Sequence, residues 1–549
     1  MADLLTTVSV LFIVAGPFLL VANRFKLPTV PLLIVAGLFS GIFVQEELTL
    51  ELAQYGIALL VFWFGVKTEL DSVRTVLKDS EVATLAQIVV VGSLGIGLGL
   101  VLGIPFQESI YLGIAAALSS TIVGAFLLQK EMQRNVVRGR LGESIHFVQD
   151  LIAVILLLVL GAGTFELDPI ATQLGYGVLF LIGAAFVNRY IFDLLGRLAG
   201  GSSELMIVGA VSILVLFIGA ARLTEVSIIV GAFAAGLAIR HDRERHLDLF
   251  NGIESIKDFF VAIFFLTIGA LVALPTPETL LLAAGLVVLT AVVKPAVTTV
   301  VLIYQGYEAR SATLTSLGID QVSEFSLIIA IQALLLGALG QTVFDAIILA
   351  AAMTMITSSL SQRFDERIYQ VLADRNLIVG RHSKIDASSR VPEGMAGHVI
   401  VVGYGRQGRK LVRACRSLDQ ACVVVENDPE VRQIVREECE AFVFGDAMDR
   451  YTWEKAQAGS AKLILSTVPY DPISKRILEL GVDADVVLNA TEVDTALDLM
   501  EEGALYVVVS DLLAGEQLVT YTQAIISGEM TPEELRSQQM AALPPKNSS

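Results

Sequence analysis

The chain is poor in cysteine, tryptophan and charge. Its three cysteines, Cys415, Cys422 and Cys439, all lie in the last third, and their odd number and irregular spacing argue against a disulfide framework or a zinc site. We therefore expect reduced thiols and no structural metal. Only 17% of the residues are charged, whereas soluble domains have about 25%. A nucleic-acid-binding surface would need a clustered excess of Lys and Arg, which this sequence lacks, so no nucleic-acid partner is expected.

Long apolar runs occupy the first two thirds of the chain instead. With 54% hydrophobic residues, the composition is typical of a polytopic membrane protein. The first run is followed by Arg24 and Lys26, so it is predicted to be a membrane span rather than a cleaved signal peptide. We expect about thirteen spans from the apolar pattern, at 4–25, 29–45, 51–67, 81–104, 109–129, 144–163, 170–192, 203–222, 224–240, 258–275, 278–304, 313–339 and 343–361.

The distribution of basic residues predicts the topology. Lys and Arg gather in every second loop, and Arg222 is the one basic residue in the other set. Because cytoplasmic loops carry the excess of Lys and Arg, the C-terminal part is expected in the cytoplasm. Because the number of spans is odd, the N-terminus is then expected outside. The protein is expected in an inner or plasma membrane.

Two ionisable residues lie inside apolar runs, Asp150 in 144–163 and Lys294 in 278–304. A charge at bilayer depth costs several kcal/mol unless it is paired or hydrated, so such residues usually indicate an ion or proton path. Asp150 could be a permanent structural partner of Lys294. Alternatively, the pair is exchangeable, and Asp150 binds Lys294, a proton or a cation in turn.

The chain becomes polar after residue 362. Residues 363–396 are predicted to form an amphipathic linker, 397–515 a Rossmann-like domain and 516–549 a polar tail. In the Rossmann-like region an apolar strand leads into a GxGxxG turn and a helix, and a second strand ends at Glu426. That order predicts a nucleotide whose phosphate lies at the helix N-terminus and whose ribose contacts the acid. The alternative is a Rossmann-like domain with an empty pocket.

Residues 402–405 also spell most of a potassium-channel filter, but they follow a soluble strand, so we reject a channel. Other stretches carry a family resemblance. They are Phe64-Gly-Val-Lys-Thr-Glu-Leu-Asp71, Ala117-Leu-Ser-Ser-Thr121, Val148-Gln-Asp150, Gly231-Ala-Phe-Ala-Ala-Gly236, Lys294, Gln321-Val-Ser-Glu-Phe325, Gly403-Tyr-Gly-Arg-Gln-Gly408, Glu426-Asn-Asp-Pro429 and Phe444-Gly-Asp-Ala447. In this order they resemble the monovalent cation:proton antiporter-2 family, specifically Kef-type potassium/proton antiporters with a C-terminal KTN (TrkA-N) nucleotide-binding domain.

The resemblance implies a polytopic α-helical membrane protein with an inverted-repeat, NhaA-like antiporter fold, followed by an α/β Rossmann-like domain. Spans 109–129 and 313–339 would be interrupted in mid-membrane, where free backbone carbonyls and helix dipoles can help to bind a cation. Val322 and Ser323 stand where relatives have glycines, so we expect a less sharp break there. The implied ion and proton site comprises Asp150, Gln149, Lys294, Ser120, Thr121, Glu324 and Asp320. Ordinary helix packing is the alternative for the hydroxyl residues.

Gln149, before the essential Asp, is typical of the potassium-transporting group, so the resemblance implies one-for-one K+/H+ exchange. A Na+/H+ antiporter and a non-transporting sensor subunit are the alternatives, and no enzyme activity is expected. The nucleotide, AMP, ATP or NAD(H), would contact Gly403, Tyr404, Gly405, Arg406, Gln407, Gly408, Glu426, Asp428, Asp446 and Ala447. A homodimer in membrane lipid is implied. Nothing recognisable implies glutathione regulation.

Overall fold

A computed structural model describes residues 4–68, 81–133, 137–160, 167–199, 202–224, 226–239, 247–375, 377–378, 382–428 and 431–542. The end of the 64–71 motif, Pro429 and the last part of the predicted tail lie outside these residues. The chain forms two compact units, Met1–Gln133 with Arg138–Gly380, and Arg134–Val137 with Arg381–Ser549. Each unit is described by itself.

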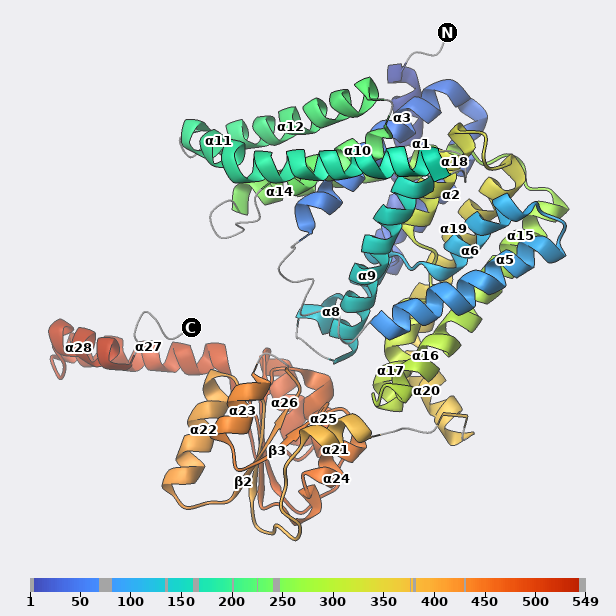
Figure 1. The fold of residues 1–549 in the computed structure, drawn as a ribbon. Helices are drawn as coiled ribbons and strands as arrows, with labels where there is room; N and C mark the ends of the chain where they lie inside the picture. Colours follow the sequence, from blue (N-terminus) through green and yellow to red (C-terminus); the bar gives the residue numbers. More distant parts are fainter. Residues whose placement is uncertain are drawn as a thin grey trace. The chain divides into compact units, whose positions relative to one another are not determined.

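The described residues of the first unit form helices and the loops between them, and no strand (Figure 1). Its elements are α1 (Leu4–Phe25), α2 (Thr29–Ser40), η1 (Gly41–Phe43), α3 (Glu46–Lys67), η2 (Gln87–Val91), α5 (Gly92–Val101), α6 (Phe106–Ala117), α7 (Thr121–Leu127), α8 (Gln129–Gln133), α9 (Val137–Leu160), α10 (Leu167–Phe186), η3 (Val187–Ile191), α11 (Phe192–Ala199), α12 (Ser203–Leu223), α13 (Ile228–Leu237), α14 (Leu247–Ala270), α15 (Pro277–Val288), η4 (Leu289–Val293), α16 (Lys294–Tyr304), α17 (Ala309–Leu317), α18 (Glu324–Leu335), α19 (Gln341–Arg363) and α20 (Asp365–Asp374). Every predicted span overlaps at least one of these helices. Among the described residues, nine helices are long and apolar enough to cross a membrane.

Two of the predicted spans are interrupted, as expected. α6 and α7 are separated at 118–120, and α17 and α18 at 318–323. Ser120 and Ser323 are N-caps, because their side-chain oxygens accept hydrogen bonds from backbone N–H groups of the following turn at 3.2 and 3.0 Å. The interruption at 318–323 is the longer of the two, and the expectation that Val322 and Ser323 make it less sharp than in relatives stays a prediction. A serine cap starts the second helix, α18.

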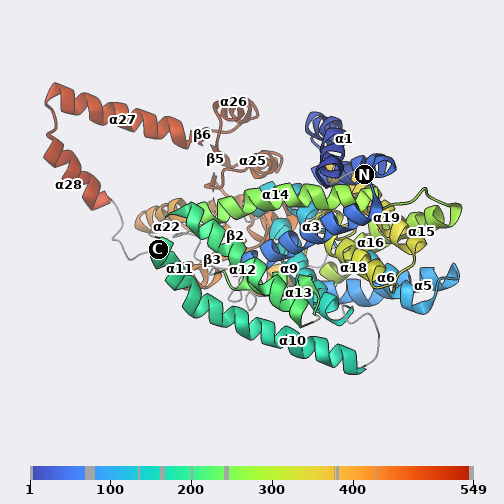
Figure 2. The ribbon, with the colours of Figure 1, turned by 90° about the horizontal axis from the view of Figure 1, so that it is seen from above.

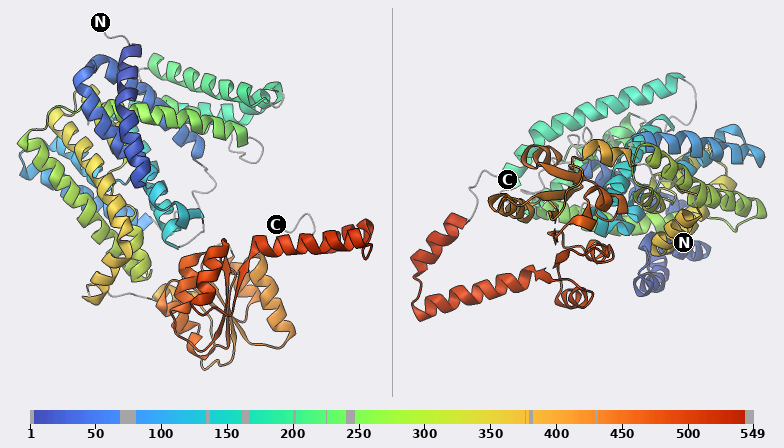
Figure 3. Two further views of the ribbon diagram at one scale, coloured as in Figure 1. Left: turned by 180° about the vertical axis from the view of Figure 1, so that it is seen from behind. Right: turned by 90° about the horizontal axis from the view of Figure 1, so that it is seen from below.

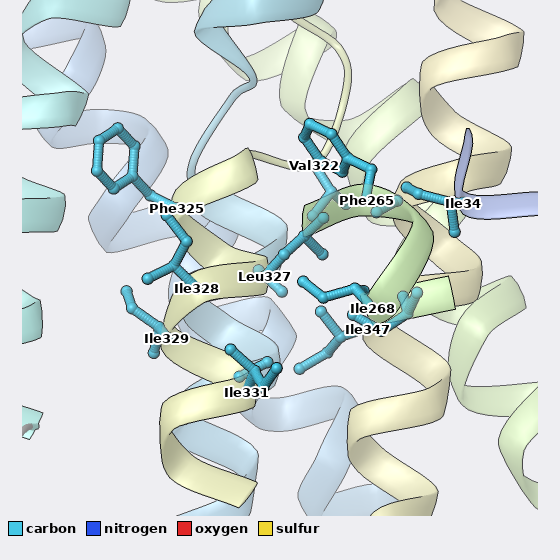
Figure 4. Packing of buried hydrophobic residues seen from close by; sticks show 14 of the residues in the cluster. Ile34, Phe265, Ile268, Val322, Phe325, Leu327, Ile328, Ile329, Ile331 and Ile347 are labelled. Atoms are coloured by element: carbon cyan, nitrogen blue, oxygen red, sulfur yellow. The ribbon is translucent and has the colours of Figure 1, made fainter. Parts of the chain in front are cut away.

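Large apolar side chains pack the interrupted helix α18 against its neighbours. Figure 4 shows Leu327 of α18 on the side of Phe265 and Ile268 of α14 and Ile347 of α19, whereas Phe325 points away from them; all belong to one buried cluster. Glycine permits the closest helix approaches. A Cβ atom on Gly95 of α5 would lie 2.8 Å from the Cα of Gly113 in α6, so any larger residue would separate the two helices. Figures 2 and 3 show the helices of this unit from other directions.

The second unit contains a six-stranded parallel sheet in the order β3-β2-β1-β4-β5-β6. The strands are β1 (Val399–Val402), β2 (Cys422–Glu426), β3 (Ala441–Phe444), β4 (Leu463–Ser466), β5 (Asp485–Ala490) and β6 (Tyr506–Val509). The helices are α21 (Ser383–Ser388), α22 (Arg406–Ser417), α23 (Arg432–Glu438), α24 (Arg450–Lys455), η5 (Ala458–Ser460), α25 (Asp471–Leu478), α26 (Val493–Glu501), α27 (Ser510–Ser527) and α28 (Pro532–Ala542). One buried cluster unites the sheet with α22 and α23, and another unites it with α24, α25 and α26, so both faces are covered. This is the doubly wound arrangement. Its ligand crevice is expected at the carboxyl ends of β1 and β4, where the strand order reverses.

Candidate functional site

Asp150 lies on α9 and is only 2% exposed. Its two carboxylate oxygens are 2.8 and 2.7 Å from the hydroxyl of Thr121, the first residue of α7, which donates to the carboxylate. Because Thr121 begins a helix, the positive end of that helix faces the Asp150 carboxylate and stabilises its charge. The interruption after α6 therefore directs both a hydroxyl group and a helix dipole at Asp150.

Glu324 is a second buried carboxylate, and it lies at the start of the helix that follows the other interruption. It is the first residue of α18, and its Oε1 accepts a hydrogen bond from the backbone N–H of Ile122 at 3.1 Å. Its Oε2 is buried and has no hydrogen-bond partner. Glu324 also interacts electrostatically with Asp150. Two carboxylates thus meet where the interrupted helices cross, and one unpartnered oxygen is the kind of group that a bound proton or cation would satisfy.

Gln149 holds the first interruption in place rather than presenting a free oxygen. Its Oε1 accepts from the backbone N–H of Ser119 at 2.8 Å, and its Nε2 donates to Oε1 of Gln87 at 2.5 Å. Gln87 in turn donates to the hydroxyl of Thr298 at 2.6 Å. Gln87 and Thr298 were not predicted from the sequence, although a glutamine inside an apolar span was a visible signal. Gln87 also begins a π-helical turn, a feature often found at functional sites.

Lys294 does not pair with Asp150 in this structure, which contradicts the permanent structural pair, whereas an exchangeable pair stays a prediction. Its ammonium group is fully buried and donates to the backbone carbonyls of Leu118 at 3.0 Å and Gln321 at 2.8 Å. One carbonyl comes from each interruption, so Lys294 joins the two. The helix breaks create strong acceptors that a sequence pattern does not show, and these acceptors compete with the carboxylate for the ammonium.

Most carbonyls expected to bind the cation are already occupied. Besides the two bound by Lys294, the carbonyl of Ile319 accepts from the hydroxyl of Ser119 at 2.8 Å. The carbonyl of Ser120 accepts from the side-chain amide of Gln321 at 3.2 Å, while its own hydroxyl caps α7. Each of these carbonyls keeps one lone pair, and the carboxylates and the hydroxyl of Thr121 add further oxygen atoms for a cation at the crossing.

Asp320 lies in the second interruption, next to the carbonyl that Lys294 binds. Its Oδ2 accepts from the hydroxyl of Ser361 at 3.0 Å, and its Oδ1 is buried without a hydrogen-bond partner. Lys294 interacts electrostatically with Asp320. The structure therefore places Asp320 with Lys294, and Glu324 with Asp150.

In the second unit the glycine-rich turn has the geometry that the fingerprint requires. Gly403 has φ of +89°, which favours glycine. A Cβ on Gly408 would collide with the carbonyl of Gly403, so this glycine permits close contact between helix and strand. A Cβ on Gly405 would meet nothing within 4 Å. The space above Gly405, at the N-terminus of α22, is thus open to a phosphate, with Arg406 and Gln407 exposed on the first turn.

Glu426 stands at the end of β2, as predicted, but its carboxylate already has backbone donors. Its Oε2 accepts from the N–H of Tyr404 at 2.5 Å, and its Oε1 accepts from the N–H groups of Asn427 and Asp428 at 2.7 and 2.9 Å. It therefore ties the glycine-rich turn to the end of β2. Each carboxylate oxygen can accept a further bond, so a ribose hydroxyl can still be accommodated.

The structure shows how three predicted nucleotide contacts, Tyr404, Asp446 and Ala447, are placed, and their contacts with a ligand stay predictions. Tyr404 is 2% exposed, and its hydroxyl donates to Glu438 at 2.6 Å. Burial raises the pKa of this phenol, which stays protonated as a donor. Its side chain belongs to the core, so only its backbone can face a ligand. Ala447 is likewise a core residue. Asp446 is 6% exposed and accepts from the N–H of Met448 at 2.9 Å, which stabilises the turn after β3.

Two polar residues at the same edge of the sheet were missed. Thr467 follows β4 and donates to the carbonyl of Val402 at 2.9 Å. Asn489, near the end of β5, lies 3.5 Å from the side-chain oxygen of Gln407, and its own side-chain oxygen is buried without a partner. Polar residues that end apolar strands are the signal that could have found them.

A helical membrane unit with two interrupted helices that cross at buried carboxylates, joined to a soluble Rossmann-like unit, defines a secondary transporter with a ligand-binding domain. Residues 8–363 match the family described as the transmembrane sodium/hydrogen exchangers, and residues 399–510 match the TrkA-N domain. The chain belongs to this exchanger family and is a cation/proton antiporter with a C-terminal TrkA-N domain.

Known proteins are similar to this chain. YbaL of Escherichia coli (strain K12) is 24% identical over 556 residues, which cover 96% of this chain and 98% of YbaL. The glutathione-regulated potassium-efflux system protein KefC of Salmonella schwarzengrund is 26% identical over 552 residues, which cover 94% of this chain and 83% of KefC. The solved sodium proton antiporter MjNhaP1 of Methanocaldococcus jannaschii is 17% identical, with a TM-score of 0.49, and the match covers 66% of this chain and 99% of that one.

Proposed function

We propose that the protein exchanges K+ for H+ by alternating access around Asp150, under the control of a nucleotide bound to the soluble domain. The observation that carries the proposal is the buried contact of Asp150 with Thr121 beside the unpartnered oxygen of Glu324. A cation needs these oxygens deprotonated, whereas a proton neutralises the same group. Binding of one ion therefore excludes the other, and this competition couples the two fluxes.

Potassium is favoured over sodium by the residue before Asp150. In the family that the chain resembles, a glutamine at the position of Gln149 is typical of the potassium-transporting group. Gln149 is also neutral, so this position adds no second ionising group, which is consistent with exchange of one cation for one proton. The potassium-efflux name of the KefC relatives favours the same cation. Na+/H+ exchange is the alternative on the same scaffold.

Flux measurements on the purified protein in proteoliposomes test this proposal. We expect an outward K+ gradient to drive proton uptake, with little dependence on membrane potential and with a weaker response to an equal Na+ gradient. A larger response to Na+ would select the sodium alternative. Absence of proton flux with either cation would indicate a non-transporting subunit.

Control by a nucleotide rests on the open space above Gly405 and on the exposed first turn of α22. AMP, ATP and NAD(H) all present a phosphate for this turn and a ribose for Glu426. A regulatory ligand must have different affinities for two states of the transporter, or it cannot shift their populations. Addition of each nucleotide to the flux assay tests which of them changes the exchange rate.

The first helix after the last span is fixed to the membrane unit by two ion pairs. Asp365 accepts from Arg138, near the start of α9, at 2.8 Å, and Glu366 accepts from Arg310, near the start of α17, at 2.8 Å. A chain that ends after Arg375 keeps both pairs. We expect it to exchange K+ for H+ at a rate that no nucleotide changes.

A chain that ends after Gln362 loses both pairs and leaves the half-buried Arg138 without one of its partners. We expect it to unfold at a lower temperature, by several degrees, because loss of partly buried charge pairs costs about 1–3 kcal/mol. Thermal unfolding in detergent compares the two truncated chains. Equal stability would show that α20 contributes little to the membrane unit.

We also propose that the protein is a homodimer with the N-terminus outside. The predicted spans 1–3 and 8–10 would form a static scaffold, and spans 4–6 and 11–13 a moving core. Native mass spectrometry from mild detergent is expected to show twice the mass of one chain. A monodisperse monomer would contradict this.

A further inference from the structure

Lys294 and Asp320 form a buried charged cluster that the exchange of ions at Asp150 does not use directly. Lys294 is fully buried and Asp320 is 2% exposed. Two of the three N–H groups of the lysine bind the carbonyls of Leu118 and Gln321, and Gln321 is the chain neighbour of Asp320. The ammonium of Lys294 is therefore held at the residue that follows Asp320 in the chain.

The carboxylate of Asp320 needs a positive partner. One oxygen accepts from Ser361 at 3.0 Å, but the other is buried and has no hydrogen-bond partner. Neutral hydroxyls do not balance a buried negative charge, and an unpaired charge in a low-dielectric interior is costly. Lys294 and Asp320 interact electrostatically, and among the described residues Lys294 is the only lysine or arginine with which Asp320 does so.

The partners of Asp150 are different. Among the described residues, the charged groups that act on its carboxylate are Glu324 and Lys67, at the end of α3. Lys294 makes a direct ion pair with neither Asp150 nor Asp320, but it acts electrostatically on Asp320 and not on Asp150, while its N–H groups bind the two interruptions. If the ammonium left these carbonyls for Asp150, it would take the place that a cation must occupy.

We propose that Asp320 is the counter-charge of Lys294 and a positioning residue for transport: it retains the ammonium on the carbonyls of the two interruptions and so leaves Asp150 free to exchange a cation for a proton. This inference rests on the proposed function, because it assigns a role in the same site. It explains why this chain has an acid at position 320, which the family resemblance does not require.

The test is a double-mutant cycle with Asp320→Asn and Lys294→Met, measured as K+-driven proton flux in proteoliposomes. In Asp320→Asn the ammonium has lost its counter-charge and competes with K+ at the remaining carboxylates. We expect the apparent KM for K+ to rise about tenfold with the maximal rate reduced much less, since close charges in a protein interact by well over the energy of one tenfold step.

The second substitution removes the competitor. In the double variant Asp320→Asn/Lys294→Met, we expect the KM for K+ to return to within about threefold of the wild-type value, as the cycle predicts for two coupled residues. A double variant whose KM is as high as that of Asp320→Asn would overturn the proposal. So would a wild-type KM in Asp320→Asn alone.

Asp345 provides the matched control. It is another buried acid of the same membrane unit, on α19, and it accepts from the side chain of Gln341 at 2.7 Å, away from Lys294. Asp345→Asn is expected to keep the KM for K+. An equal rise in this variant would mean that any buried acid has the effect, and would overturn the proposal.

Protein stability gives a second readout that does not need transport. Asp320→Asn is expected to lower the unfolding temperature in detergent, and the added Lys294→Met substitution is expected to recover most of the loss, because it removes the uncompensated charge. If Asp320→Asn does not fold, a folded double variant still supports the pairing, and a double variant that also fails to fold overturns it. Absence of exchange by the wild type would overturn the proposed function, whereas the stability cycle would still decide the pairing.

Discussion

Asp150→Asn is expected to abolish exchange while the protein still folds and inserts into the membrane. Asparagine has nearly the same volume and can keep a hydrogen bond with Thr121, which now lies 2.7–2.8 Å from the carboxylate. It cannot bind a proton and cannot neutralise a cation. We expect K+-driven proton flux to fall at least about 100-fold, because loss of the only charge that alternates between the two ions removes several kcal/mol of binding energy.

Two further variants make this result specific. Thr121→Val keeps the carboxylate but removes its hydroxyl donor, so we expect a smaller loss, of about tenfold, since a hydrogen bond to a charged group contributes about 1.5–3 kcal/mol. Asp345→Asn removes a buried acid on a different helix, α19, and is expected to retain exchange. Cation flux that still depends on pH in Asp150→Asn would refute a mechanism with Asp150 as the shared site, and would direct attention to Glu324.

Much of the fold could be predicted because its signals are local. Apolar runs and basic loops predicted the helical membrane part, and Ser120 and Ser323 stand where helix caps interrupt two spans. The order of strand, glycine turn, helix and acidic strand end predicted the parallel sheet, and the register of β1 with both β2 and β4 confirms it. In each case a few neighbouring residues determine the structure.

The partners inside the ion site could not be predicted in the same way. The apolar pattern identified Asp150 and Lys294 as the buried charges, but the acceptors of Lys294 are backbone carbonyls of two segments more than a hundred residues apart in the chain. Every residue has a carbonyl, so the sequence does not indicate which of them is free. The link from Gln149 to Gln87 is hidden for the same reason, because it depends on how α9 lies against the π-helical turn η2.

Side-chain direction was the other source of error. Tyr404 lies between two glycines of the phosphate-binding turn, and this position suggested a ligand contact. Its ring instead points into the core, where it binds Glu438 and packs near Arg409, 5.6 Å from the ring centre. The turn therefore presents backbone rather than side chains to a ligand. This directs the next test to a position whose side chain would enter the open space.

Gly405→Val is expected to abolish nucleotide binding without unfolding the domain. A Cβ at this position meets no atom within 4 Å, and the backbone angles, φ −70° and ψ −164°, suit a β-branched residue. The valine methyl groups would instead occupy the space where a phosphate must approach the N-terminus of α22. We expect the Kd to rise about 100-fold, because the phosphate loses close charge-assisted bonds to backbone N–H groups.

Calorimetric titration of the full chain with AMP, ATP and NAD(H) measures this loss, and the flux assay measures its consequence. The variant should exchange ions at a rate that no nucleotide changes, because the membrane unit is intact. Gly459→Val is the control: its Cβ also meets nothing within 4 Å, but Gly459 lies in η5, away from the glycine-rich turn. Unchanged nucleotide affinity in Gly405→Val would place the ligand elsewhere, since no nucleotide phosphate could share that space with a valine side chain.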